Sequence, residues 1–165
     1  MDDLVERIIE ILTAEVKTAR GIKQIYDGDI YLIPHVSMPA IVVQGTQNAV
    51  ANTSENISVY DLTQIDIILV QDALDYLNGK FTENTANKVA RKIIEERDTN
   101  FKYKSDTITG ALQMNLDNDS TRVLKIMRTD VKYSQIIVRG TGEQPYPVIE
   151  TTVSVVIQTK NYNRV

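Results

Sequence analysis

Residues 35–45 read His-Val-Ser-Met-Pro-Ala-Ile-Val-Val-Gln-Gly, and this stretch decides the fold. Pro39 cannot donate a hydrogen bond to a strand ladder, so it belongs at the entrance or the edge of a strand over Ala40–Gln44. Three β-formers follow in succession at 41–43, which is typical of a strand covered on both faces. The stretch therefore predicts a central strand with a packed layer above and below it.

Two helices are predicted around this strand. Residues 2–20 carry apolar side chains at helical spacing, and Gly21 follows as a stop signal. Residues 82–98 carry a second apolar stripe of the same spacing. Each helix has one apolar face, which must pack on another element, most simply a sheet.

Further strands are predicted from alternating or continuous apolar runs. They cover Ile22–Tyr26, Ile57–Gln71, Ile108–Leu116, Val131–Val138 with a phase slip near Gln135, and Ile149–Thr159. The last two are expected to form an antiparallel hairpin, while residues 122–128 fit either a strand or a short helix. Thr46–Asn56 is polar and nearly without pattern, so we expect a long loop there.

The order of these elements predicts an α+β fold, in which two main α-helices pack against a mostly antiparallel β-sheet. The length of 165 residues suits a single domain over residues 1–165. With 22 acids against 18 bases, the net charge of −4 favours solubility and disfavours a dedicated nucleic-acid surface. We find no leader and no run of about 18 apolar residues, so we expect a cytoplasmic origin and no membrane partner.

Catalytic chemistry has few candidates in this chain. The absence of cysteine excludes disulfides, thiolate metal sites and a cysteine nucleophile. His35 is the only imidazole, and Ser37 lies near it without a nucleophile-elbow motif around either residue. Asp72 and Asp75 could pair as general acid and base, although solvated loop acids are far commoner. His35, Asp72 and Asp75 are the only support for an enzyme or a ligand-binding domain.

Cofactor and metal motifs are imitated but not completed. Gly140–Pro145 lacks the lysine of a phosphate loop and reads better as a hairpin connection. Asp117–Thr121 begins like a calcium loop, but arginines stand where the glycine and the final glutamate should be. We therefore predict no cofactor, no metal and no catalytic residue.

The second helix has a basic side that is interrupted by acids, which favours a solvated face: its bases are Lys88, Arg91, Lys92 and Arg97, and its acids are Glu95, Glu96 and Asp98.

The layout resembles the tail terminator proteins, also called tail completion or neck proteins, of tailed bacteriophages. The resemblance rests on an N-terminal amphipathic helix and on four stretches in order: 21–29 (GIKQIYDGD), 38–45 (MPAIVVQG), 64–71 (QIDIILVQ) and 87–97 (NKVARKIIEER). It implies a structural virion protein that forms a ring, usually a hexamer, at the head-proximal end of the tail. Such a ring caps the tail tube and joins it to the head–tail connector, with a lumen through which genomic DNA can pass.

A ring subunit needs two different surfaces for its neighbours, because rotational rings use heterologous contacts. Polar loops that order on contact suit this role. The candidate interface residues are Thr46, Gln47, Asn48, Asn52, Thr53, Asn56, Arg139, Glu143, Gln144 and Tyr146. These residues come from two segments, Thr46–Asn56 and Arg139–Pro147. The alternative is that both segments are merely mobile loops. Two other functions stay open, namely a small assembly or adaptor protein, such as another head–tail joining component, and a small enzyme.

Overall fold

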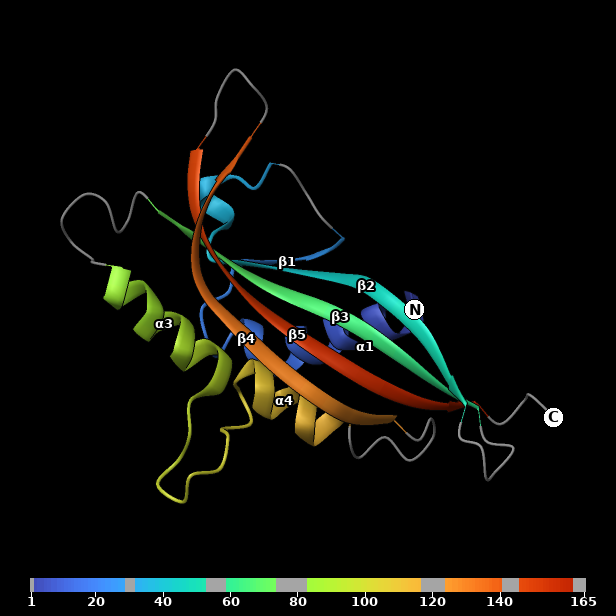
Figure 1. Cartoon of the computed structure of the whole chain (residues 1–165). Coiled ribbons are helices and arrows are strands. Elements are labelled where there is room, and N and C mark those ends of the chain that lie inside the picture. Colours follow the sequence, from blue (N-terminus) through green and yellow to red (C-terminus); the bar gives the residue numbers. More distant parts are fainter. Residues whose placement is uncertain are drawn as a thin grey trace.

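The chain forms a five-stranded sheet with the strand order β1-β2-β3-β5-β4 and with helices packed on one face (Figure 1). The computed structural model describes residues 2–28, 32–52, 59–73, 83–116, 124–140 and 146–161. The strands are β1 (Gln24–Asp27), β2 (Ala40–Asn52), β3 (Val59–Asp72), β4 (Leu124–Arg139) and β5 (Tyr146–Asn161). β1 is parallel to β2 and every other neighbouring pair is antiparallel, which confirms the predicted α+β class.

In the part of the chain that the structure describes, three α-helices cover one face of the sheet: α1 (Asp2–Leu12), α3 (Glu83–Glu95) and α4 (Ile108–Asn115). α1 continues as a π-helical turn over Thr13–Lys17, and the chain then reverses at Gly21, whose φ of +69° is left-handed as the stop signal predicted. α1 lies against β1 and β2, α3 lies against β4 and β5, and α4 contacts both other helices. Within the described ranges, no helix combines the length and the apolar character needed to cross a bilayer.

The start of β2 is buried on both faces, as the opening stretch predicts. All four residues of Ala40–Val43 are 0% exposed. Ile41 and Val43 join the core under the helices, while Ala40 and Val42 join a second core on the opposite face. The connector between β1 and β2 covers this second core with Ile33 and Met38. The sheet is therefore a middle layer at this end of the molecule.

Residues 108–116 form a helix, so the prediction of a strand there was wrong. Thr107 is the N-cap: its side-chain oxygen accepts a hydrogen bond from the Gly110 amide at 3.0 Å. The first five residues of α4, Ile108–Leu112, are all buried. This part of the helix has no polar face, because exposed side chains begin only at Gln113, and its accidental alternation imitated a strand.

The polar stretch Thr46–Asn52 belongs to β2, so the predicted loop at 46–56 was wrong for this part. Its backbone pairs with β3 from Gln47↔Gln64 to Asn52↔Val59, after a register shift between Gly45 and Gln47. Antiparallel ladder bonds hold this part of the strand irrespective of side-chain polarity. Residues 53–58 lie outside the described part of the chain.

The remaining strand predictions are largely confirmed. Residues 124–128 form the start of β4, which decides the ambiguous segment in favour of a strand. The register between β4 and β5 shifts between Lys132 and Gln135, where the phase slip was expected, and the two strands pair as an antiparallel hairpin.

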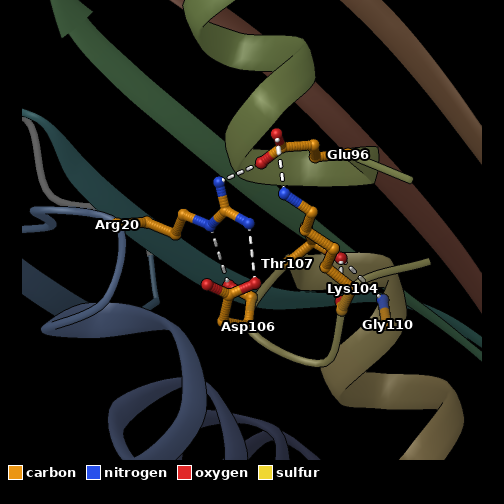
Figure 2. A network of polar contacts seen from close by, with 6 residues as sticks. All are labelled: Arg20, Glu96, Lys104, Asp106, Thr107 and Gly110. Atoms are coloured by element: carbon orange, nitrogen blue, oxygen red, sulfur yellow. Dashed lines mark hydrogen bonds and ion pairs between the residues drawn. The ribbon is translucent and has the colours of Figure 1, made fainter. Parts of the chain in front are cut away.

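A network of charged side chains fixes the ends of the helices to one another (Figure 2). The Arg20 guanidinium contacts the Glu96 carboxylate at 2.5 Å and the Asp106 carboxylate at 2.6 Å, and Lys104 Nζ contacts Glu96 at 3.0 Å. Arg20 is only 13% exposed, so this pairing is screened less than an ordinary surface ion pair. The network joins the segment after α1 to the end of α3 and to the connector before α4.

The network predicts a loss of stability in acid. The hydrogen bond from Arg20, followed by that from Lys104, lowers the pKa of Glu96 below its ordinary value of 4.5. Because the folded-state pKa is the lower one, the stabilisation is complete above about pH 4.5 and disappears as the pH falls through the folded-state pKa. Urea titrations at several pH values should therefore show the wild type and Glu96→Gln converging in acid. A constant gap between the two proteins would contradict this. Glu6→Gln, an exposed change of the same type, is the control.

Gly110 is predicted to tolerate no side chain. A Cβ built at this position would lie 1.9 Å from the Lys104 carbonyl oxygen, which is a backbone atom. Gly110→Ala should lower the free energy of unfolding by about 1–3 kcal/mol in chemical denaturation, although alanine normally favours a helix. Gln113→Ala, on the exposed side of the same helix, should change it by less than about 0.5 kcal/mol. A stabilised Gly110→Ala variant would show that the close approach is absent.

Candidate functional site

The structure brings His35 and Asp72 together, although 37 positions separate them. His35 begins the short 3₁₀ turn His35–Ser37 in the connector, and Asp72 ends β3. The distance between His35 Nδ1 and Asp72 Oδ2 is 2.6 Å, with the imidazole 51% exposed and the carboxylate 11% exposed. Because β2 and β3 are antiparallel and Ala40 lies opposite Val70, the segment before β2 and the end of β3 lie at the same end of the sheet.

Tyr146, at the start of β5, ties the same connector to the sheet. Its hydroxyl accepts a hydrogen bond from the Ile33 amide at 2.7 Å and donates one to the Ile33 carbonyl at 2.9 Å. Its ring lies 5.3 Å from the His35 ring, centroid to centroid. Ile33 is fully buried, so the Tyr146 hydroxyl satisfies two backbone groups that lack access to solvent.

This cluster has the geometry of a structural clip. A carboxylate that orients an imidazole is also one half of a hydrolytic triad, and the other half is a hydroxyl nucleophile on the imidazole. Ser37, the serine nearest in sequence, makes no hydrogen bond to His35 within the described residues. Asp75, the other acid considered for catalysis, lies outside them. The contacts that are present hold the connector over the second core.

Six of the ten predicted interface residues belong to strands. Thr46, Gln47, Asn48 and Asn52 lie in β2, Arg139 ends β4, and Tyr146 begins β5. Arg139 Nε contacts Glu150 Oε1 at 2.6 Å in a pair of which each side chain is about a tenth exposed, so this guanidinium is engaged within the chain. Thr53, Asn56, Glu143 and Gln144 lie outside the described residues, as do Asp117–Thr121 and residues 141–145 of the glycine-containing connection.

The sheet face opposite the helices is polar beyond the second core. Asp66 accepts hydrogen bonds from the Ser154 hydroxyl at 2.7 Å and from the Gln64 amide at 3.4 Å. Beside it, Arg128 pairs with Asp130 at 2.6 Å on the edge strand β4. A depression of about 340 Å³ lies over these residues. Among the described residues, no group of three or more potential ligands that could hold a metal is found here or elsewhere.

The contact between α3 and β4 determines which charges α3 presents to solvent. The Tyr133 hydroxyl on β4 donates a hydrogen bond to the Glu95 carboxylate at 2.7 Å, and the Arg91 guanidinium lies 5.5 Å from the centre of the Tyr133 ring. Burial raises the pKa of Tyr133, and the hydrogen bond to Glu95 raises it further, so the phenol stays protonated. Glu95 is thus turned toward β4 and engaged there.

Comparisons with known proteins give little beyond this geometry. No protein-family model matches the sequence, and no curated protein matches it. Among solved structures, a chain described as "Virion of native gene transfer agent (GTA) particle" is similar to this chain with a TM-score of 0.36 and 10% identity, over 95% of this chain and 92% of that chain. A similarity at this level does not establish a shared fold.

The Tyr146 clip predicts a measurable contribution to stability. Tyr146→Phe keeps the ring but leaves the buried Ile33 amide and carbonyl without their partner, which should cost about 1–3 kcal/mol of unfolding free energy in urea titrations. Tyr26→Phe is the matched control, because Tyr26 packs against the same core and its hydroxyl makes no hydrogen bond within the described residues. Equal stabilities of the two variants would contradict the role given to Tyr146.

Proposed function

We propose that this protein is a structural virion protein, a tail-terminator-like subunit that forms a ring at the head-proximal end of a phage tail. In this role it caps the tail tube and joins it to the head–tail connector. The observation that carries the proposal is the layout of the sheet: three helices of the described chain cover one face and much of the other face is uncovered by the described residues, while the outer backbone edges of β1 and β4 pair with no further described strand. Such a subunit has distinct surfaces for its neighbours.

The two ends of the sheet differ in chemistry. One end of the sheet is formed by the β4–β5 hairpin and by the segment between β1 and β2, which Tyr146 holds against it. Four large apolar side chains are exposed there, Ile136 and Val138 on β4 and Leu32 and Val36 on the β1–β2 segment. Exposed apolar groups of this size favour contact with another protein. At the opposite end, β2, β3 and β5 run on beyond the helices to a narrow arm (Figure 1). The predicted interface residues Thr46–Asn52 lie on this arm, so the interface we propose there consists of strands in place of a loop.

A ring between two different partners needs two different axial surfaces. The apolar hairpin end and the polar arm supply one surface each. One of them is assigned to the tail tube and the other to the head–tail connector protein, in either order. The ring is proposed to be a hexamer with a lumen that admits genomic DNA. Neither metal nor cofactor enters this role, and we propose no enzymatic activity.

The proposal is tested by electron microscopy of the protein and of its parent particle. The purified protein, alone or with tail tube protein, should form closed rings, and immunogold labelling of virions should mark the head-proximal end of the tail. A strictly monomeric mass both alone and with tube or connector protein, or labelling elsewhere on the particle, would contradict it.

A second candidate, a small hydrolase, is favoured only by the contact between His35 and Asp72. The conservative variants His35→Gln and Asp72→Asn separate the two functions. A structural clip predicts lower thermal stability with ring formation retained at low temperature. A hydrolase predicts unchanged stability and the loss of a measurable turnover.

A further inference from the structure

The outer face of α1 is acidic. Asp3, Glu6 and Glu10 follow one another at helical spacing and are all exposed, opposite the apolar face that carries Ile8 and Leu12 into the core. Arg7 lies among them and contacts Glu10 at 3.3 Å, a pair that is open to solvent. Acids therefore predominate on the side of α1 that the chain itself does not cover.

The outer face of α3 is basic. Lys88, Arg91 and Lys92 are exposed on this face, and within the described residues neither lysine makes an ion pair. Two of the three acids among these bases in the sequence are engaged within the chain, Glu95 with Tyr133 and Glu96 with Arg20 and Lys104. The third, Asp98, is exposed and lies beyond the end of α3. The exposed side of α3 therefore carries a net positive charge, which the alternation of bases and acids in the sequence does not reveal.

The α3 face is also hollowed. A depression of about 420 Å³ is lined by Lys88, Arg91, Lys92, Glu95, Glu96 and Arg97. Val89, beside Lys88, is a partly exposed apolar side chain on the same helix. A partner surface could therefore bury some apolar area here in addition to pairing charges, which matters because isolated surface ion pairs contribute little.

The acidic and basic faces lie on opposite flanks of the molecule. α1 packs against β1 and β2 at one edge of the sheet, and α3 packs against β4 and β5 at the other edge, with α4 between them (Figure 1). One chain thus carries a negative flank and a positive flank that do not face each other.

We propose that the acidic face of α1 in one copy docks on the basic face of α3 in the next copy. The partner is a second copy of this chain, because each copy carries both complementary surfaces. Contacts between two different flanks are heterologous, and repeated head to tail they close into a ring when the rotation permits. The inference rests on the proposed ring and assigns its lateral interface.

Charge reversal tests this interface directly. Lys88→Glu with Lys92→Glu makes both flanks acidic, and Glu6→Lys with Glu10→Lys makes both flanks basic. In low salt, each double variant alone should self-associate at least about tenfold more weakly than the wild type in sedimentation experiments. An equimolar mixture of the two variants should regain the wild-type association, with alternating copies, because each α1–α3 contact is then complementary again.

Controls separate the interface from general effects. Lys23→Glu with Lys102→Glu changes the net charge by the same amount as the α3 variant but leaves both helices intact, and should associate like the wild type. Circular dichroism should show that every variant is folded, since all substituted side chains are exposed.

The outcomes that overturn the inference are distinct. Wild-type protein that remains monomeric in low salt at the highest concentration reached would overturn it, as would reversed variants that associate normally. Loss of association without recovery in the mixture would show that the basic face of α3 docks on a surface of the next copy other than α1, and would also overturn it. Failure of the proposed function appears separately, as the absence of the protein from the head-proximal end of the tail.

Discussion

The fold depends on the burial of its central strands on both faces. The first four residues of β2 are fully buried, so β2 requires a packed layer on each side. Three helices supply one layer and the connector with Ile33 and Met38 supplies the other. Burial of a large aliphatic side chain contributes about 1.5–3 kcal/mol, which makes these two interfaces the main stabilising contribution. The polar contacts mainly determine how the covering segments sit.

Two polar clusters hold the covering layers in place. On the helix side, Arg20 bridges Glu96 and Asp106 and so connects segments that are 76 and 86 positions apart. On the other side, Tyr146 satisfies the buried backbone of Ile33, and His35 contacts Asp72 at the rim. His35, the only histidine of the chain, therefore helps to hold the segment between β1 and β2 against the end of β3. This contact is a physical reason for a histidine just before the buried strand.

Sequence periodicity predicts the elements that have one apolar face or a continuous apolar run, such as α1, α3 and the start of β2. It fails for α4, because Ile108–Leu112 is buried on all sides and leaves no polar face to be recognised. Thr107 as an N-cap was the signal that could have identified this helix. It also fails for Thr46–Asn52, because this part of β2 is held by backbone pairing with β3. Backbone hydrogen bonds form with polar and apolar residues alike, so no alternation of side chains is required.

The surface charge of α3 could not be predicted from the sequence either. Glu95 and Glu96 interrupt the bases in the sequence, but Tyr133 and Arg20 engage these acids from elements that are distant along the chain. Only the folded chain separates an acidic flank on α1 from a basic flank on α3. Head-to-tail docking of these two flanks would close the proposed ring.

Cysteine cross-linking measures this docking most directly, because the chain has no cysteine of its own. In a Glu10→Cys, Lys92→Cys double variant, mild oxidation should give a ladder of disulfide-linked oligomers on a non-reducing gel, ending at the closed ring. Either single variant should give no species larger than a dimer. A double variant that remains a monomer after oxidation, while the wild-type protein forms rings in the electron microscope, would contradict the docking of α1 on α3.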